Sequence, residues 1–189
     1  MQNFSLYQAL NFWAIRTLLS PLLSPDAIIF PRRASILMSL VHFESLSVSH
    51  GCVGTVSGFD HSLLDQVQAG WEASPFPYPV GMYEHRLLSA PQAVMDLDFA
   101  QPICALERTS QLICCEAGAC HGVVYWISYD LDGKRTWSTH PRRAPDGHKQ
   151  LVRFFQPSVS LAEGGVVTVH ARFDLESGEV DLEFNYEPM

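Results

Sequence analysis

Alternation of apolar and polar residues dominates the second half of the chain. In residues 166–174 and again in 180–186, apolar side chains occupy every second position. A two-residue period predicts strands with one buried face. We predict seven such strands, at residues 94–99, 111–116, 122–131, 136–140, 150–156, 166–174 and 180–186. Asp132-Gly133 and Ser177-Gly178 stand between them and favour hairpin turns, so this half is expected to form an antiparallel β-barrel.

The first half has a mixed pattern. Apolar residues at three- and four-residue spacings over residues 4–19 predict a helix, which Pro21 and Pro25 end. Further predicted elements are two strands at 27–30 and 34–43, a loop at 47–58, a helix at 59–71 and an extended proline-rich linker at 75–79. The fold class is therefore mixed α/β and mostly β.

Composition narrows the function classes. The 189 residues are 47% hydrophobic and 17% charged, which is typical of a folded domain. Lys and Arg number 12 against 20 Asp and Glu, and the net charge of −8 argues against a nucleic-acid partner. The apolar stretch at 17–30 contains prolines and is too short for a membrane span. Five cysteines, an odd number without a secretory signal, favour reduced thiols and a cytoplasmic and nuclear location.

Two groups of residues suggest a ligand site at first sight. Gly51, Gly54 and Gly58 lie between a predicted strand and helix, where a cofactor loop would sit, but the spacing is not G-x-G-x-x-G, which favours an ordinary connection. The cluster Cys114, Cys115, Cys120 and His121 suggests zinc. Adjacent cysteines on a strand point to opposite faces, which favours buried thiols, so we predict no metal site. None of the scattered histidines stands beside a serine or cysteine in a nucleophile motif such as G-x-S-x-G, so we also predict no catalytic residue.

Three sequence strings, taken together in their order along the chain, are more specific than either of these two groups. Residues 121–127 (HGVVYWI), 137–141 (WSTHP) and 148–155 (HKQLVRFF) resemble consecutive barrel strands of the protein arginine methyltransferases. In that family a strand beginning with His leads to a Ser-Thr-x-Pro turn and then to a Thr-His-Trp-Lys-Gln loop. Residues 57–60 (SGFD) are similar to the family's Tyr-Gly-Phe-Asp segment, and residues 30–36 (FPRRASI) to its proline-marked strand pair. The C-terminal strands resemble the second module of the tandem-module members.

The resemblance implies a domain organisation. Residues 1–60 would be the trailing edge of the Rossmann-like methyltransferase core, including its last helix and strands. Residues 61–189 would be the β-barrel domain, with a short arm or linker at 61–80, where family members carry a helical arm that pairs modules. The sequence would then be a fragment or a C-terminal, pseudo-catalytic module that supplies the barrel side of the substrate cleft and module-module contacts.

The resemblance also implies a cofactor and partners. Family members bind S-adenosyl-L-methionine on a glycine-rich loop and hold the substrate guanidinium with two glutamates. Neither element is found in this sequence, so the chain alone is expected to bind no cofactor and to be inactive. The implied partners are a catalytic methyltransferase module and arginine-rich protein substrates such as histones or splicing factors. The alternative is a non-catalytic acidic β-barrel that binds arginine-rich proteins, in keeping with the negative charge.

One family site element has a counterpart in the loop at 141–149. Lys149-Gln150 matches the family's Lys-Gln, whereas Asp146, Gly147 and His148 replace Thr-His-Trp. We name Asp146 and His148 as candidates for the substrate cleft; the alternative is a hydrated loop.

A core helix and strand separated from their parent sheet would also expose apolar side chains. We expect Phe12, Trp13, Ile28 and Phe30 to be exposed and to promote association.

Overall fold

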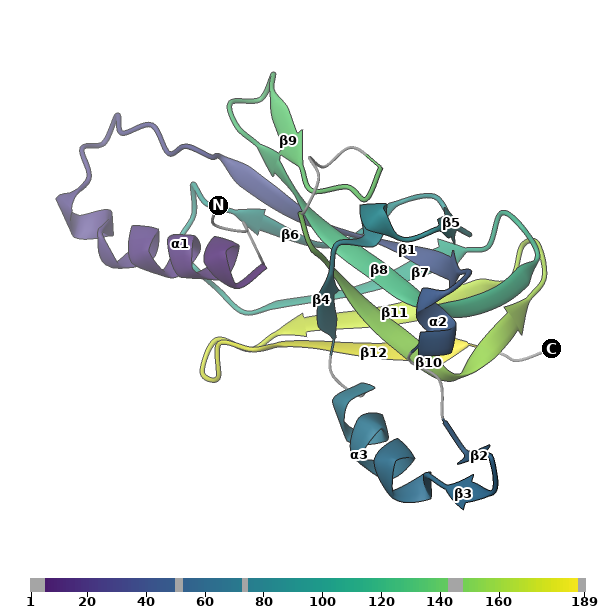
Figure 1. Cartoon of the computed structure of the whole chain (residues 1–189). Coiled ribbons are helices and arrows are strands. Elements are labelled where there is room, and N and C mark those ends of the chain that lie inside the picture. Colours follow the sequence, from purple (N-terminus) through teal and green to yellow (C-terminus); the bar gives the residue numbers. More distant parts are fainter. Residues whose placement is uncertain (1–5, 50–52, 73–74, 143–147, 187–189) are drawn as a thin grey trace.

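The computed structural model describes residues 6–49, 53–72, 75–142 and 148–186 (Figure 1). Its helices are α1 (Leu6–Leu18), α2 (Leu46–Ser49) and α3 (Ser62–Glu72), with single 3₁₀ turns η1 (Ser20–Leu22) and η2 (Val80–Met82). Its strands are β1 (Arg33–Phe43), β2 (Thr55–Val56), β3 (Phe59–Asp60), β4 (Phe76–Tyr78), β5 (His85–Leu87), β6 (Gln92–Asp98), β7 (Leu106–Ile113), β8 (Gly118–Asp130), β9 (Thr136–Ser138), β10 (Gln150–Leu161), β11 (Val166–Phe173) and β12 (Val180–Tyr186).

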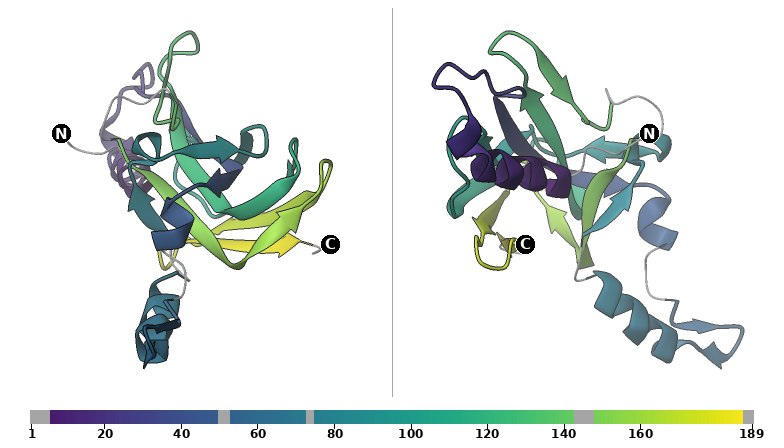
Figure 2. Two further views of the ribbon diagram at one scale, coloured as in Figure 1. Left: turned by 45° about the vertical axis from the view of Figure 1, so that its right-hand side comes forward. Right: turned by 90° about the vertical axis from the view of Figure 1, so that its left-hand side faces the viewer.

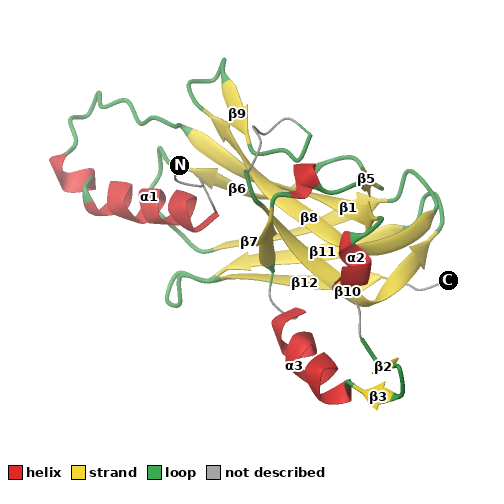
Figure 3. Ribbon diagram, in the orientation of Figure 1, coloured by secondary structure: helices red, strands yellow, loops and turns green. Residues whose placement is uncertain are grey.

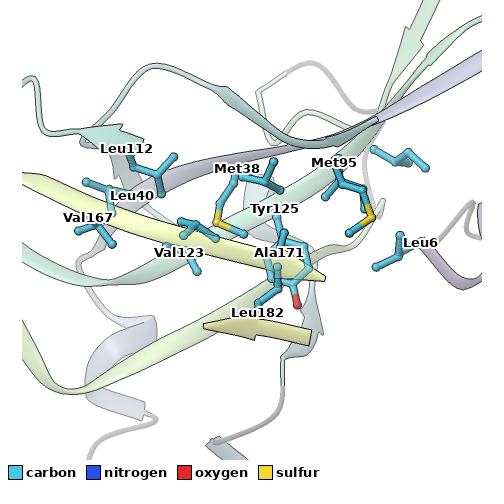
Figure 4. Close-up of a cluster of buried hydrophobic side chains, with 14 of the residues drawn as sticks. Leu6, Met38, Leu40, Met95, Leu112, Val123, Tyr125, Val167, Ala171 and Leu182 are labelled. Atoms are coloured by element: carbon cyan, nitrogen blue, oxygen red, sulfur yellow. The ribbon is translucent and has the colours of Figure 1, made fainter. Parts of the chain in front are cut away.

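Two antiparallel sheets form the body of the molecule. The larger sheet has the order β4-β10-β8-β1-β5, with β6 also paired to β1 and β9 to β8; the smaller has the order β12-β11-β7. Their inner faces enclose the main core, in which Val123 and Tyr125 of β8 lie close to Val167, Ala171 and Leu182 of the small sheet (Figure 4). The alternation seen in the sequence thus reflects one face turned to a shared core.

The ladders of the described residues do not close into the predicted barrel. β12 pairs with β11, and where β12 approaches β10 the contacts come from side chains. Arg153 of β10 donates a hydrogen bond to the carbonyl oxygen of Leu182 at 2.8 Å and lies over the ring of Phe184. The register of β10 against β8 also shifts between Phe154 and Val159, which turns the strand at this level and interrupts its ladder.

Helix α1 covers one end of the space between the sheets. Trp13 is 2% exposed, packs edge-on against Phe99 and donates from its indole nitrogen to the carbonyl of Gln101 at 2.8 Å. The expectation that Trp13 would be exposed is therefore wrong, and Phe12 is also partly buried. The expectation is confirmed for Ile28, which is 91% exposed. No helix in the described ranges is long and apolar enough to cross a membrane.

Most predicted elements are present, with instructive differences. The predicted strand at 27–30 is irregular backbone, and three short pieces were not predicted as strands: β4, β5 and the β2–β3 hairpin. β1, from the first predicted domain, pairs with β8 from the second over nine positions, Arg33 to Val41. Residues on both sides of position 60 thus share one sheet and one core. The assignment of residues 1–60 to the edge of a methyltransferase core stays a prediction.

A third part of the chain stands away from this body. The β2–β3 hairpin and α3 lie below the sheets in Figure 1 and, coloured by secondary structure, in Figure 3. The two further views in Figure 2 agree that they project outward. We call residues 53–72 the arm; it begins before the arm or linker predicted at 61–80 and ends within that range. The loop expected at 47–58 contains α2 and β2, and the helix expected from residue 59 begins at Ser62.

Candidate interaction surfaces

The loop before β10 carries the two residues singled out from the sequence. Asp146 lies outside the described residues. His148 is half-buried, and its ring lies edge-on to the ring of Trp137 with 5.7 Å between the centroids. Its carbonyl oxygen accepts a hydrogen bond from Gln150 Nε2 at 3.1 Å. The side chain of His148 is therefore held against β9.

Gln150 joins three segments around this loop. Its side chain is fully enclosed, with 2% of the residue exposed. Oε1 accepts from the Val80 N–H at 3.0 Å, and Nε2 donates to the carbonyl oxygens of Thr139 at 2.9 Å and of His148. A buried amide with these partners fixes η2 and the end of β9 to the start of β10. Sequence reasoning noted Gln150 only as part of a motif. The available signal was its place at the boundary between the polar His148-Lys149 pair and the apolar Leu151-Val152 pair.

A pocket of about 250 Å³ lies beside this network. It is bordered by the start of α1, by β4 and β8, and by the start of β10, with apolar walls that include Leu6, Ile36 and Ile127. Lys149 contributes the charged group, and Tyr125 a hydroxyl whose pKa is raised by burial, so the phenol stays a neutral hydrogen-bonding group at physiological pH. The pocket suits the apolar part of a peptide side chain.

The arm presents apolar side chains to solvent. Phe59 is 72% exposed, Leu63 76%, Leu64 53% and Val67 62%. These residues belong to one hairpin and the helix that follows it. Clustered exposed apolar residues on a projecting segment are typical of a protein–protein interface.

Short-range hydrogen bonds shape the arm. The Asp65 carboxylate accepts from the backbone N–H groups of Val53 at 2.7 Å and Gly54 at 2.9 Å. Asp60 accepts from the Ser62 N–H at 2.9 Å and forms an Asx turn directly before α3. Gly54 and Gly58 have positive φ angles of 61° and 84° in and beside the hairpin, and Gly51 lies outside the described residues. Two glycines of the suggested cofactor loop thus shape the arm.

The cysteine cluster is divided between two segments: Cys114 and Cys115 follow β7, whereas Cys120 and His121 lie on β8. Cys114 is buried and Cys115 is exposed, and burial raises the pKa of the Cys120 thiol to about 11. His121 Nδ1 accepts from the Phe43 N–H at 3.0 Å. In the part of the chain that the structure describes, no three His, Cys, Asp or Glu side chains could hold a metal ion.

Comparison with known proteins now decides the family. Residues 32–187 match the model of the arginine methyltransferase oligomerization subdomain. The chain belongs to the protein arginine methyltransferase family. It is 31% identical over 185 residues to protein arginine N-methyltransferase 7 of Oryza sativa subsp. japonica, covering 92% of this chain and 25% of that protein. It is 29% identical over 206 residues to the Danio rerio protein of the same name, covering 95% and 29%.

A solved structure shows the same fold. The Trypanosoma brucei arginine methyltransferase 1 enzyme–prozyme heterotetramer, a complex with S-adenosylhomocysteine, matches with a TM-score of 0.77 at 13% identity, over 98% of this chain and 62% of that chain. At this identity the match concerns the fold alone. The chain thus corresponds to the oligomerization subdomain of arginine methyltransferases and spans about a quarter of the length of the two curated relatives.

Proposed function

We propose that the chain acts as a C-terminal, pseudo-catalytic module of a protein arginine methyltransferase. In this role the arm pairs with a catalytic methyltransferase module, and the sheet around the pocket forms the barrel side of the substrate cleft. The observation that carries the proposal is the projecting arm with Phe59, Leu63, Leu64 and Val67 exposed, inside a match to an oligomerization subdomain.

A second apolar surface supports the proposal. Leu18, Leu22 and Ile28, in α1 and the segment after it, are 79%, 81% and 91% exposed. We infer that residues 1–60, apart from the part of the arm that they contain, are the trailing edge of a methyltransferase core, and that further parts of such a core would cover these side chains. The proposed sites of action are the cytoplasm and nucleus.

We propose that Gly54 and Gly58, the described glycines of the suggested cofactor loop, do not hold S-adenosyl-L-methionine. Both stand in the arm, and apart from their chain neighbours no heavy atom lies within 4 Å of where a Cβ would be, so they face open space. We therefore place cofactor binding and methyl transfer in the partner module. The proposed substrates are arginine-rich proteins such as histones or splicing factors, which the net charge of −8 suits.

Pairing through the arm can be tested with Leu63→Glu. We expect this variant to bind a catalytic arginine methyltransferase module at least about tenfold more weakly in sedimentation velocity, because a charge cannot be buried in an apolar interface. The matched control is Leu175→Glu, which is 48% exposed in the β11–β12 turn and should bind like the unaltered chain. Equal affinity of both variants would contradict the proposal.

A second candidate function is a stand-alone module that binds arginine-rich proteins. It is favoured by exposed acidic residues such as Asp181 and Glu183, which lie on the outer side of β12. Calorimetric titration with an Arg-Gly-rich peptide separates the two. Strong, salt-sensitive peptide binding without any catalytic module supports this second function, whereas peptide binding only in the presence of the module supports the first.

A further inference from the structure

Two histidines face each other where the arm leaves the body. His42 lies on β1 and His121 on β8, and their ring centroids are 4.6 Å apart. Both are half-buried, with 16% of the His42 side chain exposed. They lie beside Phe43, the last residue of β1, after which the chain continues through α2 to the arm. We call residues 43–49 the arm root.

The hydrogen bonds of the pair define which ring nitrogens carry protons. His42 Nδ1 lies 2.8 Å from the carbonyl oxygen of Ala119, and because a carbonyl only accepts, this nitrogen is the donor. His42 Nε2 lies 3.3 Å from Glu44 Oε1, so a proton added there is paired with a carboxylate. His121 Nδ1 instead accepts from the Phe43 N–H, which requires an unprotonated nitrogen.

Three hydrogen bonds involve the backbone of Phe43 and Glu44 at the start of the arm root, and one of them is sensitive to protons. Ser47 Oγ donates to the carbonyl of Phe43 at 3.0 Å, and the Glu44 N–H donates to the carbonyl of Glu84 at 3.2 Å. Neither depends on an ionisable side chain. The third, from the Phe43 N–H to His121, is lost when His121 Nδ1 takes up a proton, because two donors then face each other.

The surrounding charges favour one proton on the pair over two. Glu44 faces His42 on β1, and Arg86 of β5 lies opposite His42 in the register but is paired with Glu116. Glu84 meets the root through its backbone carbonyl, and the ring of His85 on β5 lies beside that of Phe43 with its Nδ1 on the carbonyl oxygen of Tyr83. On β10, which runs on the other side of β8, residues 154–159 carry no charged side chain. A proton on His121 would therefore be opposed by one on His42, and Glu44, whose charge favours it, contacts His42 directly.

We propose that His42 and His121 form a proton-sensitive joint that holds the arm root closed at neutral pH and loosens it on acidification. Burial, and after it His42, lowers the pKa of His121 below its ordinary value. The opened root therefore takes up a proton more readily than the closed one. The closed root is fully stable above about pH 6.5 and loses stability as the pH falls from there toward the lowered pKa. The joint relies on the proposed function only in treating residues 53–72 as an interaction arm.

The test is amide hydrogen exchange of the arm root between pH 5 and 8 (roughly the range in which histidine titrates), corrected for the intrinsic exchange rate. In the unaltered chain we expect protection of peptides covering 43–49 to fall about fivefold or more between about pH 7.5 and about pH 5.5, the effect of one lost hydrogen bond. His121→Gln should remove this dependence, because an amide oxygen accepts from the Phe43 N–H without titrating. His170→Gln, at an exposed histidine bonded to Thr109, should keep it.

Several outcomes would overturn the joint. A flat profile in the unaltered chain, or an unchanged profile in folded His121→Gln, excludes it. If His121→Gln does not fold, His42→Gln replaces it. This variant removes the charge that opposes a proton on His121, so the pH midpoint of arm-root protection should move to higher pH. A midpoint that does not move counts against the joint. Binding of the catalytic module at pH 7.5, a pH chosen roughly one unit above the ordinary histidine pKa, tests the proposed function separately. Intact binding with a flat exchange profile rejects the joint alone.

Discussion

Gly122 shows how one residue shapes the contact between two strands. A Cβ at this position would lie 2.1 Å from the carbonyl oxygen of Arg153 and 2.9 Å from the Cα of Phe154. Both atoms belong to the backbone of β10, where its register against β8 shifts. The close approach of the two strands therefore depends on the missing side chain.

We predict that Gly122→Ala lowers the free energy of unfolding by about 3 kcal/mol or more, because backbone atoms cannot move aside as a flexible side chain would. Urea unfolding of the variant and the unaltered chain measures the difference. The control is Gly118→Ala on the same strand, where nothing lies within 4 Å of the added Cβ. Similar urea midpoints for the two variants would show that the β10 backbone moves to accommodate the added methyl group, and would contradict the prediction.

At the scale of elements, the arm differs from the sheets in what stabilises it. Its apolar residues are largely exposed, so hydrogen bonds within the arm must define its shape. The contacts of the Asp65 carboxylate with the Val53 and Gly54 N–H groups join α3 to the strand that enters the hairpin. Such an element opens more readily than the core.

Asp65→Ala should loosen the arm and leave the body intact. We expect exchange protection in the arm to fall by a factor that corresponds to about 1 kcal/mol, with an unchanged urea midpoint for the body, because the lost bonds are exposed and local. Hydrogen exchange measured by mass spectrometry resolves the two regions. Gln66→Ala, at an exposed neighbour on α3, is the control. Alanine favours a helix more than glutamine does, so this variant should not loosen the arm, and equal loosening would show that the Asp65 carboxylate is not responsible.

At the scale of the whole molecule, α1 decides whether the end of the core is closed. Trp13 packs against Phe99 and Phe173, which come from the ends of β6 and β11 in different sheets. The Thr17 hydroxyl accepts from the Ile103 N–H at 2.7 Å and adds a second connection to the same end. The helix thus joins the two sheets where they do not pair with each other.

Trp13→Ala should reduce the free energy of unfolding by about 3–5 kcal/mol, since it removes the largest side chain at this junction and its bond to Gln101. Chemical denaturation provides the measurement. Tyr7→Ala, on the same helix but 64% exposed, should cost less than about 1 kcal/mol. A loss of the same small size in both variants would mean that α1 contributes little to the closed core.

The periodicity of the chain was sufficient to predict the long elements. α1, β1 and β11 lie within a few residues of their predicted positions, because each carries a full apolar face. The short strands β4 and β5 were missed, since three residues contain no period and exist only through pairing with β10 and β1. At the candidate site, His148 was singled out by its motif, whereas the connecting role of Gln150 depends on partners distant in sequence.

The amino-acid sequence by itself determined the family, the mostly β composition and the alternating faces, because motifs and hydrophobic periods are local properties. Only the tertiary structure decided that α1 and β1 share the core of the strands that follow, and that β10 meets β12 through Arg153 rather than through a ladder. It also brought His42 beside His121 at the arm root. These features depend on contacts between distant segments. The local pattern is compatible with several arrangements of these segments, and side-chain packing and backbone pairing determine which one forms.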